Sequence, residues 1–160
     1  MLTIKQISEL LNQLSDELKK LNLNGEMLLT GGAAMCLVHE ARDMTKDIDA
    51  LYESKNTINE LAAMIAERED LPGDWLNDSV KGFVGANAPT EKFLSLSNLQ
   101  IYTVSAEYLL AMKMMSAGYG EKDHDDIVFL TDKLRISSAG HTADILQSFY
   151  PSSRILPKTQ

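Results

Sequence analysis

The pattern of apolar and polar positions predicts an amphipathic helix at the start of the chain. Apolar residues recur at intervals of three and four from Ile4 to Leu21, which is the helical period with one narrow apolar stripe. Such a stripe packs against the core of the same chain, or it forms the seam of a homodimer, and this spacing permits both. Asn24-Gly25 is expected to end the helix.

The next segments alternate between strand and helix. Met27–Thr30 is a short apolar run that ends at Gly31-Gly32, which is typical of a buried strand followed by a turn. Ala33–Glu40 is rich in residues that favour a helix. Asp47–Tyr52 alternates polar and apolar residues, which predicts a half-buried strand. The predicted order is therefore strand, Gly-Gly turn, helix, strand.

The remaining pattern predicts one hairpin and several further helices. The hairpin consists of strands over 92–96 and 99–104, joined at Ser97-Asn98. Trp75 is interpreted as a packing residue rather than as a platform for a nucleobase. Ser105 is expected to cap a helix that ends near Gly118–Gly120. The other helices are expected over 56–69, 74–81 (a short one), 122–134 and 142–149.

Together these elements predict an α/β (α+β) fold, with a small mixed sheet flanked by helices and a helical C-terminal part over about 105–150. No linker-like stretch separates the two parts. A chain of 160 residues is the usual size of one domain. We therefore expect a single domain over 1–160.

The composition narrows the possible partners. The chain is 44% hydrophobic and carries 15 basic against 23 acidic residues, a net charge of −8. This charge argues against coating a nucleic acid or binding an anionic membrane. A single cysteine, Cys36, forms no intramolecular disulfide and fits a reducing compartment. No stretch resembles a signal peptide or a membrane span, so we expect a cytoplasmic location and no membrane partner.

Two aspartates on the predicted strand are the first candidates for chemistry. Asp47 and Asp49 are two residues apart, so a strand directs both carboxylates to one face and turns Ile48 into the core. Adjacent carboxylates repel each other unless a positive charge lies between them. Mg²⁺ prefers such hard oxygen ligands, usually together with phosphate oxygens and water. The pair therefore predicts a magnesium site.

The diglycine turn is the second candidate. Gly31 and Gly32 follow a strand and precede a predicted helix, where glycine permits close approach of the backbone to a phosphate. The 14 residues from Ala33 to Lys46 separate this turn from the aspartate pair. A nucleoside triphosphate could contact both features, with Mg²⁺ between its phosphates and the carboxylates.

This stretch resembles the signature of the polymerase β-type nucleotidyltransferase superfamily, an apolar strand with Gly-Gly and then Asp-x-Asp between apolar residues. The spacing, with Arg42 ahead of the aspartates, is similar to the AbiEii-like branch of minimal nucleotidyltransferases, which are components of toxin–antitoxin or phage-defence systems. The resemblance implies Mg²⁺-dependent transfer of a nucleoside monophosphate from an NTP to an acceptor hydroxyl. It implies metal binding by Asp47 and Asp49, and nucleotide binding by Thr30, Gly31, Gly32 and Thr45.

A second stretch extends the resemblance toward the C-terminus. AbiEii-like proteins carry a lysine on a late helix and then an acidic motif, and here Lys113 precedes Asp123 and Asp126. The two aspartates are three residues apart and so share a helix face. The resemblance implies that Lys113 neutralises the triphosphate and that Asp123 or Asp126 positions the site or the acceptor.

One departure leaves two functions open. Polymerase β-type sites usually have a third carboxylate on a neighbouring strand, and the segment 92–104 contains no Asp or Glu. Either the site operates with Asp47 and Asp49 and help from Asp123 or Asp126, or the chain is a binding module such as an antitoxin or regulatory partner. The acceptor could be tRNA, a protein or a small molecule. Membership of a toxin–antitoxin pair would imply a cognate toxin or antitoxin protein.

Overall fold

A computed structural model describes residues 1–85, 87–116 and 121–151. Contacts along the chain divide it into two units. The first unit consists of residues 1–81 and 90–103, and the second of residues 82–89 together with the chain from 104 onward. The second unit holds the C-terminal helices, at the place where a helical part is expected from the sequence. The expectation of one domain stays a prediction.

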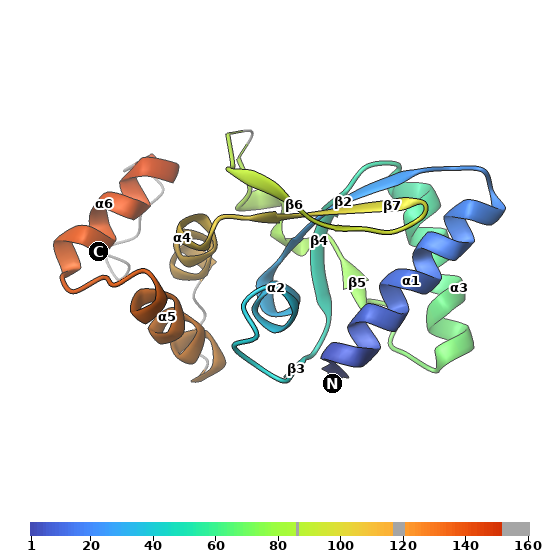
Figure 1. Cartoon of the computed structure of the whole chain (residues 1–160), viewed down its shortest axis with the longest axis horizontal. Coiled ribbons are helices and arrows are strands. Elements are labelled where there is room, and N and C mark those ends of the chain that lie inside the picture. The colour runs from blue at the N-terminus through green and yellow to red at the C-terminus, as the bar shows by residue number, and fades with distance from the viewer. Residues whose placement is uncertain (86, 117–120, 152–160) are drawn as a thin grey trace. The chain divides into compact units, whose positions relative to one another are not determined.

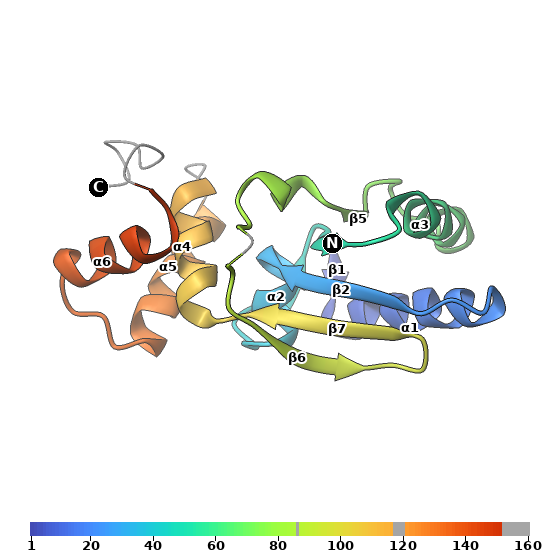
Figure 2. The ribbon, with the colours of Figure 1, turned by 90° about the horizontal axis from the view of Figure 1, so that it is seen from above.

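A mixed sheet forms the first unit. The strands are β1 (Leu2–Thr3), β2 (Gly25–Thr30), β3 (Met44–Thr45), β4 (Ile48–Tyr52), β5 (Leu76–Asn77), β6 (Thr90–Ser95) and β7 (Leu99–Val104). Five of them form one sheet in the order β5-β4-β2-β7-β6, and β1 pairs with β3 (Figures 1 and 2). β2 runs antiparallel to β4 and parallel to β7, and β4 runs parallel to β5. The expected mixed sheet is confirmed.

Helices cover one face of this sheet. They are α1 (Ile4–Lys20), α2 (Gly31–Leu37) and α3 (Lys55–Glu69), and Figure 1 shows α1 and α2 on the same side of the strands. Met27, Leu29 and Ala50 are buried on the helical side. Leu28 and Leu51, which alternate with them and are paired across the strands, are half-buried. The face of the sheet that carries Leu28 and Leu51 is called the open face below.

Two capping hydrogen bonds fix the start of the N-terminal helix. The Thr3 hydroxyl accepts a hydrogen bond from the Gln6 amide at 3.1 Å, and the Gln6 side chain accepts one from the Thr3 amide at 2.9 Å. This reciprocal pair satisfies two donors at the helix start. The predicted stop at Asn24-Gly25 is wrong: α1 ends at Lys20 and Gly25 begins β2. A Cβ at Gly25 would lie 2.9 Å from the Leu18 side chain, so the glycine lets this strand pass close to the helix.

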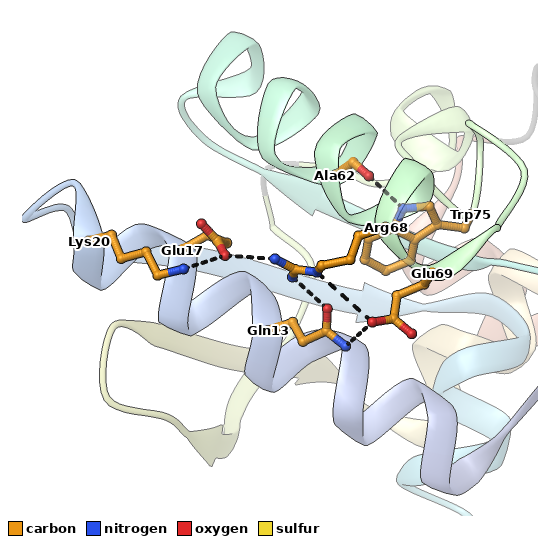
Figure 3. Close-up of polar contacts among 7 residues, drawn as sticks. All are labelled: Gln13, Glu17, Lys20, Ala62, Arg68, Glu69 and Trp75. Atoms are coloured by element: carbon orange, nitrogen blue, oxygen red, sulfur yellow. Dashed lines mark hydrogen bonds and ion pairs between the residues drawn. The ribbon is translucent and has the colours of Figure 1, made fainter.

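A polar cluster joins α1 to α3 on the helical side (Figure 3). Arg68 donates to Glu17 at 3.1 Å and to Gln13 at 2.6 Å, and Lys20 donates to Glu17 at 2.9 Å. The hydrogen bonds from Lys20 and Arg68 hold the pKa of Glu17 below its usual value. Glu17 is itself buried. The cluster borders a cavity of about 550 Å³, and none of the residues that line it is a predicted metal or nucleotide ligand.

The short helix expected over 74–81 is wrong. The chain there forms β5 and a 3₁₀ turn, η1 (Ser79–Gly82). Trp75 is buried and its indole N–H donates to the Ala62 carbonyl at 2.9 Å, so it is a packing residue, as expected (Figure 3). The Ile48 amide donates to the Trp75 carbonyl at 2.7 Å. This bond and the burial of Leu76 favour pairing with β4 over a helix.

The second unit is helical. It contains α4 (Ala106–Ser116), α5 (Glu121–Lys133) and α6 (Ala139–Phe149). Ser105 caps α4 as expected, because its hydroxyl accepts a hydrogen bond from the Tyr108 amide at 3.1 Å. The Tyr108 ring meets Phe149 edge to face, with centroids 4.9 Å apart, which packs α4 against α6. The predicted end of this helix at 118–120 lies outside the described residues.

Candidate functional site

The two predicted metal ligands lie together at the start of β4. Ile48 between them is buried, while Asp47 and Asp49 are both half-buried. Asp49 is paired with Thr30 across the strands, and the Thr30 hydroxyl donates to the Asp49 carbonyl at 3.1 Å. Directly paired residues project to the same face of a sheet. Asp49 therefore lies on the open face, two residues before Leu51.

The diglycine turn lies against this pair. Gly31 has a φ of +60°, a backbone conformation that glycine adopts readily, and it begins α2. A Cβ at Gly31 would lie 2.6 Å from Asp49 Oδ2. Only a residue without a side chain therefore leaves room for the carboxylate. The diglycine turn therefore lies against Asp49, one of the two aspartates that it was expected to meet.

Gly32 is in contact with the segment that precedes the aspartates. A Cβ there would collide with the Thr45 hydroxyl and would lie 3.2 Å from a guanidinium nitrogen of Arg42. Thr45 is buried and its strand is held by pairing with Leu2. Of the four residues expected to bind nucleotide, Thr30 and Gly31 thus contact Asp49, while Gly32 and Thr45 contact each other. Their role toward a nucleotide stays a prediction.

Two residues that the sequence analysis missed hold the carboxylates. Asn77 donates to Asp47 Oδ2 at 3.4 Å, and Ser79 donates to Asp49 Oδ1 at 3.2 Å. Between them, Asp78 forms an ion pair of 2.8 Å with Lys55 at the start of α3, and this hydrogen bond lowers the pKa of Asp78. The sequence held no usable signal for Asn77 and Ser79, because β5 is only two residues long.

The three C-terminal candidates meet in the second unit. Lys113 Nζ lies 2.8 Å from Asp126 Oδ2 and 3.4 Å from Asp123 Oδ1. Lys113 and Asp126 are buried, whereas Asp123 is half-buried. The expected common face of Asp123 and Asp126 is confirmed. Because the Lys113 ammonium bonds two carboxylates, it is also a structural group that joins α4 to α5. The role of these residues toward a triphosphate stays a prediction.

The chemistry of the donors fits a hard divalent cation. Asp47 and Asp49 supply carboxylate oxygens, the ligands that Mg²⁺ binds in proteins, and Ser79 donates a hydrogen bond to one of them. In the described parts of the chain, no group of three or more His, Cys, Asp or Glu side chains is arranged to hold a metal. A cation at this pair would therefore take its other ligands from neutral groups, water or phosphate. This is how Mg²⁺ is commonly bound at phosphoryl-transfer sites.

A shallow cavity continues the open face beyond the aspartates. It has a volume of about 340 Å³. Leu28, Leu51 and Tyr102 form its floor and are paired across β4, β2 and β7. Its margin carries Glu26, Glu53 and Lys55. The face beside the carboxylates is thus apolar and aromatic in the middle and mostly acidic at the edge.

A mixed sheet covered by helices on one face, with paired aspartates beside a Gly-Gly turn, is the arrangement of a nucleotidyltransferase. A family model agrees with this class over residues 3–134. The chain belongs to that family, which is described as nucleotidyltransferase of unknown function (DUF6036). The match supports the nucleotidyltransferase resemblance but does not extend to the AbiEii-like branch. No curated protein and no solved structure matches the chain.

Proposed function

We propose that the chain transfers a nucleoside monophosphate from an NTP to an acceptor hydroxyl, with Mg²⁺ bound by Asp47 and Asp49. The observation that carries this proposal is the contact of Gly31 with the Asp49 carboxylate, where a Cβ would lie 2.6 Å from Oδ2. This contact supports a single site, in which the turn would bind phosphate and the aspartates would bind the metal. The family match over residues 3–134 supports the same class of reaction.

The proposed reaction exchanges one phosphorus–oxygen bond for another. The acceptor oxygen forms a bond to the α-phosphorus, the bond from that phosphorus to the β-phosphate oxygen breaks, and pyrophosphate and a proton are released. When bound, Mg²⁺ would neutralise charge on the phosphates as it does in other phosphoryl transfers. The backbone at Gly31 and Gly32 would receive the phosphates that leave.

We infer that the acceptor approaches over the open face. In-line displacement requires the attacking oxygen and the leaving pyrophosphate on opposite sides of the phosphorus. The Gly-Gly turn lies at one side of Asp49, and the cavity floored by Leu28, Leu51 and Tyr102 follows on the same face in the other direction along β4. An acceptor would approach from that cavity, and the acidic margin disfavours a polyanion such as tRNA relative to a protein or a small molecule.

The proposal extends to the biological setting only through the sequence resemblance. Membership of a toxin–antitoxin or phage-defence system would give the chain a cognate protein partner. A homodimer through the apolar stripe of α1 is disfavoured, because Ile7, Leu11 and Leu14 are already fully buried within the first unit. A cytoplasmic location remains part of the proposal. In the portion of the chain that the structure describes, no helix is both long and apolar enough to cross a membrane.

Replacement of one aspartate tests the reaction. The full chain is incubated with each α-³²P-labelled NTP, Mg²⁺ and cell extract, and labelled macromolecules and released pyrophosphate are measured. For Asp49→Asn we expect transfer to fall about 100-fold or more, as when a group that stabilises transition-state charge is lost. Asp43→Asn, an exposed aspartate in the preceding segment, is the matched control and should keep wild-type transfer.

Two results would contradict the proposal. Equal labelling by wild type and Asp49→Asn would show that the pair does not bind the reacting groups. Labelling by neither, from any of the four NTPs, would favour the alternative of a binding module that has the fold without the reaction.

A further inference from the structure

The residue beside Asp49 on the neighbouring strand β5 is Asn77, whose side chain ends in an amide. β5 runs parallel to β4 on the side away from β2, and its register pairs Ile48 with Leu76 and Asp49 with Asn77. Paired residues share a face, so Asn77 lies on the open face beside the carboxylates. Its side chain is half-buried. A residue here is therefore close enough to act on the predicted metal ligands.

Asn77 and Ser79 form a short chain of hydrogen bonds between the two aspartates. The Asn77 amide nitrogen donates to Asp47 Oδ2 at 3.4 Å, which is a long bond, and to the Asp74 carbonyl at 3.2 Å. The Asn77 side-chain oxygen accepts from the Ser79 amide at 3.1 Å. The Ser79 hydroxyl donates to Asp49 Oδ1 at 3.2 Å. Each carboxylate thus has one donor from the same three-residue segment.

This segment is fixed by contacts that do not involve the aspartates. Trp75 is anchored under α3 by its bond to the Ala62 carbonyl, and Asp78 is paired with Lys55 at 2.8 Å. One anchor thus precedes Asn77 and the other lies between Asn77 and Ser79, and together they hold the backbone in place. Because the positions of the two donors are fixed independently of the carboxylates, the donors can fix the orientation of the carboxylates.

The chemistry of these donors suits a cation site. A carboxylate that accepts a hydrogen bond from a neutral amide or hydroxyl keeps its negative charge and loses rotational freedom. A lysine or arginine at position 77 or 79 would instead compete with the cation for that charge. We propose that Asn77 and Ser79 are positioning residues that orient Asp47 and Asp49 for a divalent cation. This inference rests on the proposed function, which places the cation at the pair.

Cation binding tests the inference without any need for activity. Mn²⁺ is titrated into the full-length protein and free Mn²⁺ is measured by electron paramagnetic resonance. Asn77→Ala and Ser79→Ala should each weaken Mn²⁺ binding about 10-fold or more, as the loss of groups that orient metal ligands does. Ser79→Thr keeps the hydroxyl and should bind within about 2-fold of wild type.

A charged replacement separates positioning from a merely structural role. Asn77→Asp loses the amide donor but puts a third carboxylate beside Asp49, so it should bind Mn²⁺ at least as tightly as wild type. Asp74→Asn is the control for general charge, because its side chain is exposed and only its carbonyl meets Asn77. It should change Mn²⁺ binding less than about 2-fold. Thermal melting of every variant reports on folding.

The outcomes distinguish this inference from the proposed function. If the wild type binds Mn²⁺ and both Asn77→Ala and Ser79→Ala bind it equally well, the inference is overturned and the proposed function stands. Weakening by Asn77→Asp as large as that by Asn77→Ala would assign Asn77 a structural role and also overturn it. Wild type that binds no Mn²⁺ would overturn the cation site itself, and the inference with it.

Discussion

At the scale of single residues, the site requires glycine, which has no side chain, at two positions. Gly31 leaves room for the Asp49 carboxylate, and Gly32 leaves room for the Thr45 hydroxyl. The two glycines thereby let the turn, β3 and β4 converge. Any side chain at these positions would push one of the predicted ligands out of its place.

Gly31→Ala should disturb both folding and cation binding. Alanine at a φ of +60° costs about 1–2 kcal/mol, and its Cβ would lie 2.6 Å from Asp49 Oδ2. We expect a lower midpoint in urea and weaker Mn²⁺ binding than in wild type. Gly73→Ala is the matched control, since no atom lies within 4 Å of the added Cβ. A Gly31→Ala protein with the stability and Mn²⁺ affinity of the control would show that this close approach does not matter.

The residues predicted from sequence and those missed differ in how local their signals are. Asp47 and Asp49 could be placed on one face because the strand period acts between neighbours in the chain. Asn77 and Ser79 reach the same carboxylates from 30 residues away in the sequence. Their position is set by the pairing of β5 with β4, and no local pattern encodes that pairing.

At the scale of elements, the same distinction holds. The apolar period predicts α1, because 17 residues contain several repeats of that pattern. β3 and β5 contain two residues each, too few for any period, and both exist only through pairing with distant strands. The local pattern over 74–81 accordingly predicts a helix. Its buried Trp75 and Leu76 in fact attach it to α3 and β4.

The contact of α1 with α3 should make stability depend on pH through Glu17. Its pKa in the folded protein is lowered from about 4.5 by hydrogen bonds from Lys20 and Arg68. A lowered pKa means that Glu17 takes up its proton at a lower pH in the folded protein than in the unfolded protein. The stabilisation is therefore present above about pH 4.5 and is lost as the pH falls through the lower folded value.

Glu17→Gln tests this directly. At pH 7 the variant should have a lower urea midpoint than wild type, and the difference should shrink as the pH falls below 4.5. Glu9→Gln is the control, because the pair of Glu9 with Lys5 is exposed and 3.7 Å long and should contribute little. A difference between Glu17→Gln and wild type that stays constant from pH 7 to pH 3 would contradict the assigned cause.

At the scale of the whole molecule, the predicted site residues are divided between two units. Those expected to bind metal and nucleotide belong to the first unit, and Lys113, Asp123 and Asp126 belong to the second. The second group forms its own buried ion pair, 2.8 Å long. Breaking such a pair leaves an uncompensated buried charge, whereas replacing both partners with apolar residues is often neutral. Single and double variants of this ion pair can therefore distinguish a structural role of Lys113 from a role in substrate binding.

Lys113→Met should destabilise the second unit by about 3–5 kcal/mol, because it leaves Asp126 buried without this cation. Hydrogen exchange should then increase in α4 and α5, and β2 and β4 should keep their protection if the units open separately. The double variant Lys113→Met, Asp126→Leu should regain most of the lost stability. Nucleotide affinity is then measured on this double variant, whose stability is restored, by titration with ATP and Mg²⁺. Affinity well below wild type would support a contact of Lys113 with the triphosphate, and unchanged affinity would restrict Lys113 to holding α4 and α5 together.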